Sequence, residues 1–253
     1  MSDFPSTFFW YELVTTDPRA ATDFYAHVVG WKPEPFGGPG SDYMVMNMDR
    51  RGVAGIIATP EAAKGAPPAW MGYVYTDDVD ATAKTVVAAG GSIHHGPLDI
   101  PEVGRFAVVA DPQGAHFMIM KPGMEGGGPA PIKPGFVGWH ELMSADWKKA
   151  FDFYAKVFGW TKDQTIPMGE MGDYQLFAAG KEAIGGMMNK PETMPVSAWG
   201  FYFIVPELDA ALDRVKAKGG KVIFEPVEVP GGAWACNAVD AQGAAFGLTA
   251  DRR

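Results

Sequence analysis

Apolar residues recur at helical spacing directly after two aspartates that lie far apart in the chain. The apolar positions are Ala21, Phe24, Tyr25 and Val28 after Asp17, and Ala150, Phe153, Tyr154 and Val157 after Asp146. A spacing of i, i+3, i+4 and i+7 places the side chains on one face of a helix. The aspartates are typical N-caps, and Gly30 and Gly159 are typical of helix ends. Each segment therefore predicts a helix with one face against a sheet.

Short stretches rich in branched and aromatic residues predict strands. In the first half they are residues 8–15, 42–48, 53–58, 70–75, 92–95, 105–110 and 115–120. A second helix is expected over residues 79–89. Its inward-facing residues are expected to be Val79, Ala83, Val86 and Val87. Each half of the chain then spells strand, helix and three strands, twice over, which predicts an α+β fold of four βαβββ modules.

The chain is an internal duplication. Residues 10–31 read WYELVTTDPRAATDFYAHVVGW, residues 139–160 read WHELMSADWKKAFDFYAKVFGW, and 12 of these 22 positions are identical. Self-similarity of this length indicates repeated architecture. Most of the second half follows the first at an offset of 129 residues. The prediction is two tandem domains, residues 6–121 and 136–250, joined by a Gly- and Pro-rich linker over residues 122–135.

Charge and composition argue against nucleic acid and membranes as partners. With 21 basic and 30 acidic residues the net charge is -9, and without a Lys/Arg run nucleic acid is not expected as a partner. No apolar stretch approaches the roughly 18 residues of a membrane span. The N-terminus lacks signal-peptide features, and a cytoplasmic protein is expected. Cys236, the single cysteine, is predicted to be a small buried hydrophobic residue and not a nucleophile.

The duplicated helix end FYxxVxGW, the turn DPQGA at residues 111–115 and the order of the modules together resemble the vicinal oxygen chelate superfamily. That superfamily includes glyoxalase I, extradiol dioxygenases and bleomycin-resistance proteins. The resemblance covers residues 8–249. It implies that paired modules form curved, cup-like mixed sheets with helices outside and a small molecule bound inside.

Metal binding is not expected at the positions that the resemblance assigns to it. These positions carry Trp10, Met71 and Met118 in the first half and Trp139, Gly200 and Gly247 in the second. Hard or borderline divalent cations prefer imidazole or carboxylate ligands, and none of these residues offers one. His116 becomes a candidate ligand if the last strand slips by two residues. The expectation is therefore no cofactor, with zinc, nickel or iron as the alternative.

Strand alternation places one acid of each repeat on the face that the resemblance makes the inside of the cup. Glu12 lies two residues after Trp10, and Glu141 two residues after Trp139. Each is a candidate general base or partner of a cationic ligand, or alternatively a structural tie to backbone or arginine. The full set of candidate ligand-binding residues is Trp10, Tyr43, Met71, Tyr73, Arg105, His116, Met118, Trp139, Tyr174, Tyr202, Trp234 and Asn237.

These observations predict a protein that binds a small aromatic or amphipathic molecule in a metal-free cup. Because Gly200 and Gly247 replace methionines of the first half, the larger pocket is expected in the second domain. One alternative is a metal-dependent lyase, isomerase or extradiol-type dioxygenase, and another is an antibiotic-sequestering protein. Arg105 has a second interpretation, as a strand residue paired with a carboxylate. The expected assembly is a monomer that acts as an internal pseudo-dimer, or a homodimer.

Overall fold

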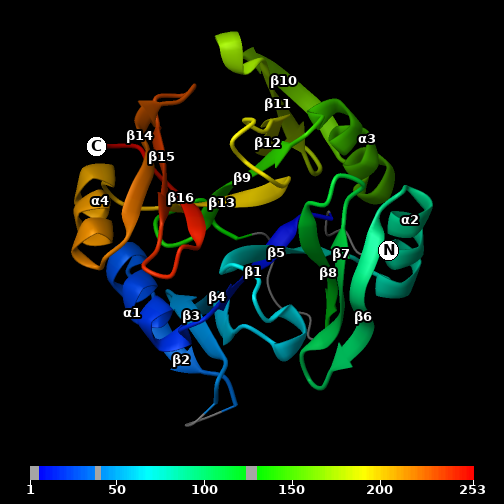
Figure 1. Cartoon of the computed structure of the whole chain (residues 1–253), viewed down its shortest axis with the longest axis horizontal. Coiled ribbons are helices and arrows are strands. Elements are labelled where there is room, and N and C mark those ends of the chain that lie inside the picture. The colour runs from blue at the N-terminus through cyan, green and yellow to red at the C-terminus, as the bar shows by residue number, and fades with distance from the viewer. Residues whose placement is uncertain (1–5, 38–40, 124–129) are drawn as a thin grey trace. The chain divides into compact units, whose positions relative to one another are not determined.

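The computed structural model describes residues 6–37, 41–123 and 130–253. Parts of the N-terminal segment and of the predicted linker, residues 124–129, lie outside the described residues. Strands and helices follow one another in four βαβββ modules (Figure 1). The helices are α1 (Pro18–Val29), α2 (Val79–Ala88), α3 (Trp147–Phe158) and α4 (Leu208–Ala217). In the described part of the chain no helix has the length and apolar character needed to cross a membrane.

The strands form two mixed sheets of eight. The first has the order β2-β3-β4-β1-β5-β8-β7-β6 and the second β10-β11-β12-β9-β13-β16-β15-β14. The strands of the first are β1 (Phe8–Thr15), β2 (Lys32–Pro35), β3 (Met44–Met48), β4 (Arg51–Ala58), β5 (Ala69–Tyr75), β6 (Ser92–Ile100), β7 (Gly104–Ala110) and β8 (His116–Pro122). Those of the second are β9 (Val137–Ser144), β10 (Thr161–Pro167), β11 (Asp173–Ala178), β12 (Ala183–Asn189), β13 (Ala198–Ile204), β14 (Lys221–Glu228), β15 (Trp234–Val239) and β16 (Ala245–Ala250). The predicted α+β class is confirmed.

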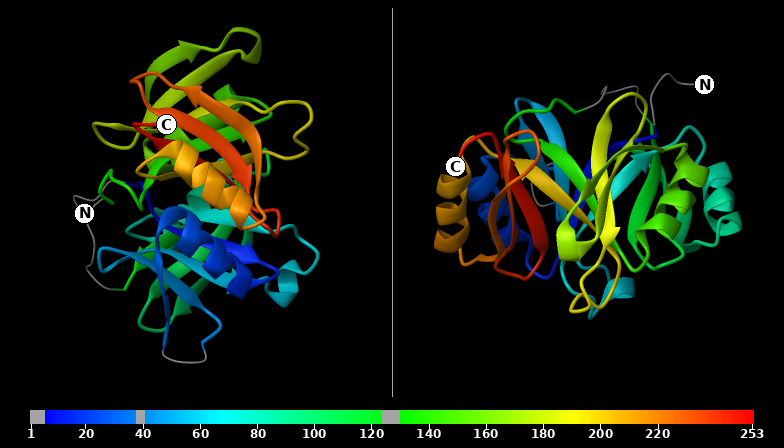
Figure 2. Two further views of the ribbon diagram at one scale, coloured as in Figure 1. Left: turned by 90° about the vertical axis from the view of Figure 1, so that its left-hand side faces the viewer. Right: turned by 90° about the horizontal axis from the view of Figure 1, so that it is seen from above.

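Two compact units combine modules from different halves of the sequence. The first unit contains Met1–Phe9, Gly72–Pro129 and Trp139–Trp199, and the second contains Trp10–Met71, Ala130–Gly138 and Gly200–Arg253. Helices α2 and α3 are neighbours in the first unit, and α1 and α4 in the second (Figures 1 and 2). The domain boundaries expected from the repeat stay a prediction.

Each unit has an aromatic core centred on the tyrosine of the repeated FY pair. In the second unit Tyr25 is fully buried and lies edge-on to Trp70, with ring centroids 5.0 Å apart. In the first unit Tyr154 lies edge-on to Trp199 at 5.2 Å. Such edge-to-face pairs add about 0.5–1.5 kcal/mol to the burial of their area. The predicted helix faces therefore lie in these cores, although Val157 of α3 is only half-buried.

The helix ends agree with the sequence, and one face assignment does not. The side chain of Asp17 accepts a hydrogen bond from the backbone N–H of Ala20 at 3.0 Å, and Gly30 ends α1 with φ of 90°. In α2, however, Val87 is 52% exposed. It directly follows the buried Val86, and a 100° step around the helix carries it out of the core. The prediction for Val87 was wrong.

Two edge strands carry no apolar pattern and were missed. Strand β2, with sequence KPEP, and strand β10, with sequence TKDQTIP, are exposed along nearly their whole length. They exist because their backbones pair antiparallel with β3 and β11. Edge strands bury little and tolerate proline, so side-chain alternation does not reveal them. Strand β6 similarly extends to Ile100, beyond the predicted end at His95.

Candidate functional site

The acid of the first repeat is held by a chain of hydrogen bonds on a half-exposed sheet face in the second unit. In β1 the residues Tyr11 and Leu13 are buried, whereas Trp10 and Glu12 alternate with them on the opposite face. The indole N–H of Trp10 donates to the Tyr43 hydroxyl at 3.2 Å, and this hydroxyl donates to Glu12 Oε2 at 2.9 Å. We call this half-exposed side of each sheet the open face.

The second repeat builds the same chain in the first unit. The indole N–H of Trp139 donates to the Tyr174 hydroxyl at 2.7 Å, which donates to Glu141 Oε1 at 3.0 Å. In both chains a tyrosine, from β11 or from directly before β3, donates a hydrogen bond to the glutamate. The sequence placed both tyrosines on the list of ligand residues but gave no reason to join them to the glutamates.

A glycine beside each glutamate makes room for the tyrosine. Gly55 pairs with Glu12 across β4 and β1, and Gly186 pairs with Glu141 across β12 and β9. A Cβ atom at Gly55 would overlap the Tyr43 hydroxyl, and one at Gly186 would overlap the Tyr174 ring. The rings therefore lie directly over the neighbouring strand, which lets the phenol reach the carboxylate.

Replacing Gly55 by alanine is expected to expel the Tyr43 ring and break its contact with Glu12. Overpacking of this kind costs about 1–3 kcal/mol, measured as the free energy of unfolding in urea. In a Tyr43→Ala background the same change should be nearly neutral, because the ring that it meets is gone. An equal cost in both backgrounds would contradict the steric role of this glycine.

The chain keeps the phenol protonated. Burial, followed by the negative charge of Glu12, raises the pKa of Tyr43, while the hydrogen bond from Trp10 lowers it. At physiological pH Tyr43 therefore stays protonated and donates a hydrogen bond to the carboxylate. Chemically, the arrangement presents a carboxylate beside an indole surface, which can accept hydrogen bonds, balance a cation or accept a proton.

Two further predicted residues, Tyr202 and Asn237, lie in a row with Phe224 and Gly247 across four strands of the second unit. Phe224 pairs with Asn237, Asn237 with Gly247, and Gly247 with Tyr202. A Cβ atom at Gly247 would overlap the ring of Tyr202. The Tyr202 side chain therefore occupies the space directly over Gly247. The larger pocket expected in the second domain stays a prediction.

Other predicted residues lie elsewhere or are paired. Arg105 makes ion pairs with Asp80 at 2.7 Å and with Asp99 at 3.1 Å, as its second interpretation expected. Its counterpart Trp234 lies 5.0 Å from the guanidinium of Arg253. Tyr73 lies opposite the buried Met118 on the neighbouring strand, and Met71 is half-buried. His116 is exposed and lies beside His94, with ring centroids 4.4 Å apart.

Two titratable groups that are buried away from solvent have shifted pKa values. Burial raises the pKa of the Cys236 thiol to about 12, which disfavours a nucleophilic thiolate as the sequence predicted. Burial lowers the pKa of His140 to about 4. The ring nitrogen Nδ1 lies 2.6 Å from the Ile184 carbonyl, and the ring stacks on Phe8. His140 is therefore a neutral core residue that donates to backbone.

Sequence reasoning missed a second pair of Trp–Tyr–carboxylate chains inside the cores. In the first unit Trp199 donates to the Tyr154 hydroxyl at 2.9 Å, which donates to Asp111 Oδ2 at 3.3 Å. In the second unit the chain is Trp70, Tyr25 and Asp240, at 2.9 and 3.2 Å. Each position recurs 129 residues later, as does the turn that carries the aspartate. The recurrence of all three residues at the same offset was the signal in the sequence from which these chains could have been predicted.

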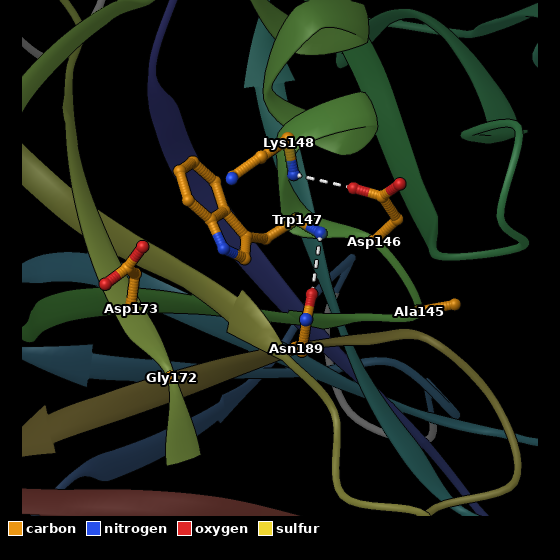
Figure 3. A pocket seen from close by; sticks show the side chains of 7 residues that line it. All are labelled: Ala145, Asp146, Trp147, Lys148, Gly172, Asp173 and Asn189. Carbon is orange, nitrogen blue, oxygen red and sulfur yellow. Dashed lines mark hydrogen bonds between the residues drawn. The ribbon is translucent and has the colours of Figure 1, made fainter. Parts of the chain in front are cut away.

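A cavity of about 420 Å³ lies at the N-terminus of α3 in the first unit (Figure 3). It is lined by Ala145, Asp146, Trp147, Lys148, Gly172, Asp173 and Asn189. The backbone N–H of Trp147 donates to Asn189 Oδ1 at 3.0 Å, and that of Lys148 donates to Asp146 Oδ1 at 3.1 Å (Figure 3). These groups cap the helix, and the cavity contains none of the predicted site residues.

The residues assigned to a metal by the resemblance do not fit one. Indole, thioether and glycine occupy those positions, and these are not ligands for hard or borderline divalent cations. Within residues 6–37, 41–123 and 130–253, no cluster of three or more His, Cys, Asp or Glu side chains could hold a metal ion.

Relatives of similar length match nearly the whole chain. A protein named "Putative glyoxylase CFP32" from Mycobacterium bovis is 33% identical over 243 residues, covering 94% of this chain and 92% of the relative. "Anthracycline biosynthesis protein DnrV" from Streptomyces peucetius is 32% identical over 258 residues, covering 94% and 91%.

Solved structures share the fold at low sequence identity. A Mn(II)-bound glyoxalase from Novosphingobium aromaticivorans has a TM-score of 0.69 at 18% identity, covering 99% of this chain and 83% of that structure. The 2,3-dioxygenase LapB from Pseudomonas sp. KL28 has a TM-score of 0.68 at 12% identity, covering 98% and 93%. A model of the Glyoxalase/Bleomycin resistance protein/Dioxygenase superfamily matches residues 7–119 and 137–247. The chain belongs to that superfamily.

Proposed function

We propose that this protein binds a small aromatic or amphipathic molecule on its open faces without a metal ion, with Glu12 or Glu141 as the polar anchor. The repeated Trp–Tyr–Glu chain carries the proposal. Two copies hold a carboxylate beside an indole through the same hydrogen bonds, on strands in which Trp, Glu and Leu recur at the same positions. Glu12 is half-buried and Glu141 is 9% exposed, so Glu12 is the more accessible of the two anchors.

The chemistry of the chain defines the ligand class. The indole surface suits an aromatic ring, and a carboxylate accepts hydrogen bonds from an ammonium or hydroxyl group. The ligand is therefore an aromatic molecule with a donor or cationic substituent. The similarity to a protein named for anthracycline biosynthesis supports an aromatic ligand, because anthracyclines are fused-ring aromatic compounds.

The test uses 1-naphthylmethylamine, a cationic aromatic probe, and fluorescence titration of the wild-type protein. Glu12→Gln and Glu141→Gln keep the shape of the side chain but remove its charge. We expect at least one variant to bind the probe tenfold or more weakly, which corresponds to about 1.4 kcal/mol. Glu170→Gln, at an exposed position, is the control. Unchanged affinity in both variants, or no saturable binding to wild type, would contradict the proposal.

The proposal that binding needs no metal ion is tested by a separate measurement. Protein purified without chelator is analysed for bound metal, and the titration is repeated after dialysis against EDTA. We expect substoichiometric metal and unchanged affinity. Stoichiometric zinc, nickel or iron whose removal abolishes binding would instead support the metal-dependent alternative. Release of a modified probe after incubation would distinguish an enzyme from a sequestering protein, since the carboxylate can also accept a proton from a bound molecule.

A further inference from the structure

Four residues of the second unit lie in one row across β14, β15, β16 and β13. They are Phe224, Asn237, Gly247 and Tyr202, each directly opposite the next. Directly opposed residues of neighbouring strands project from the same face. Phe224 is 47% exposed, so one end of the row presents an aromatic ring to solvent.

Tyr202 and Asn237 reach each other within this row because Gly247, on the strand between them, has no side chain to keep them apart. The Tyr202 ring covers Gly247, and its hydroxyl lies 3.0 Å from Asn237 Nδ2 and 3.3 Å from Oδ1. An amide carries two N–H hydrogens and an oxygen with two lone pairs, whereas a single phenol takes up only part of this capacity. The half-buried amide is therefore a polar group of mixed donor and acceptor character beside an exposed phenyl ring.

The equivalent row of the first unit has different chemistry. Its members are His95, Val108, Met118 and Tyr73, each 129 residues earlier and paired in the same order. Val108 provides no amide in place of Asn237, and Met118 occupies the position of Gly247. The two rows have the same residue only at the tyrosine position. Only the row of the second unit therefore joins the phenol to an amide.

We propose that Phe224, Asn237 and Tyr202 recognise the uncharged oxygen of a planar aromatic ligand, a ketone or a phenol. This inference rests on the proposed function and names a second polar anchor for it. The resemblance assigns a metal ligand to the position of Gly247, and here the Tyr202 ring covers that position. The amide–phenol pair is the polar group beside that position and binds the ligand by hydrogen bonding.

The experiment compares 2-naphthol with naphthalene, two probes that differ by one hydroxyl group. Asn237→Val introduces the residue of the equivalent row at nearly the same volume. We expect it to weaken 2-naphthol binding about five- to tenfold, the value of one hydrogen bond, and to leave naphthalene binding unchanged. Tyr202→Phe should act in the same direction. Val108→Ala in the equivalent row is the control and should change neither affinity.

The outcomes separate this inference from the proposed function. If Asn237→Val leaves 2-naphthol binding unchanged while Glu12→Gln or Glu141→Gln weakens 1-naphthylmethylamine binding, the inference is wrong and the proposed function stands. Equal loss of both neutral probes in Asn237→Val, with a lowered melting temperature, would assign Asn237 to structure alone and also overturn the inference. If the wild type binds none of the three probes, both proposals fail.

Discussion

Lowering the pH from 7.5 to 4.5 is expected to reduce the free energy of unfolding by about 2–3 kcal/mol through His140 alone. Burial lowers the pKa of this imidazole from 6.5 to about 4 in the folded protein. The unfolded chain therefore binds a proton near pH 6.5, whereas the folded chain stays neutral until about pH 4. Between these values the unfolded state binds more protons, so stability falls as the pH falls.

The pH dependence of wild type must be compared with that of a variant, because other groups also titrate. Burial raises the pKa of Asp111 and Asp240, which acts in the opposite direction as the pH falls. His140→Tyr introduces the residue that occupies the matched position, Tyr11, and removes only the histidine titration. Urea unfolding between pH 4.5 and 7.5 should give a flatter dependence for the variant. Parallel curves for the two proteins would show that His140 is not held neutral in the core.

Tyr154→Phe is expected to destabilise the protein by about 2–3 kcal/mol, because two buried polar groups lose a partner at once. The hydroxyl donates to Asp111 and accepts from Trp199, and all three side chains are at most 7% exposed. Tyr25→Phe should have the same effect in the second unit. Chemical denaturation at pH 7.5 measures both costs.

The protonation state of the aspartate provides a sharper test of this chain. The hydrogen bond from Tyr154 favours the ionised form of Asp111 and lowers its pKa against the effect of burial. The cost of Tyr154→Phe should therefore be largest at neutral pH and shrink as the pH falls and the carboxylate becomes protonated. Tyr75→Phe removes an exposed Tyr–Asp bond of 2.7 Å and should cost below about 0.5 kcal/mol. A cost for Tyr154→Phe that is as small as this would rule out the proposed role of the hydroxyl.

The fold was readable from the sequence where a pattern was local and repeated. Helix α1 follows from Asp17, four apolar positions and Gly30, and the structure contains each of these features. The edge strands β2 and β10 were not readable, because their prolines and polar residues obey no burial period. Backbone pairing alone defines them.

The candidate site was readable only as a list of residues. Alternation in β1 correctly placed Trp10 and Glu12 on one face. Nothing in that strand indicates that Tyr43, 31 residues further along, supplies the donor. The glycine that admits the ring, Gly55, has no signal of its own in a single sequence, because its meaning depends on the side chain of a neighbouring strand.

The sequence by itself determined the duplication, the βαβββ order, the superfamily and the lack of suitable metal ligands at the expected positions. These properties depend on residue type and on spacing along the chain, which a repeat displays directly. Only the tertiary structure decided that Tyr43 and Tyr174 hold the two glutamates, that Tyr202 covers Gly247, and that Tyr25 and Tyr154 bind buried aspartates. Each of these contacts joins residues distant in the sequence, and strand register and side-chain volume decide which of them meet.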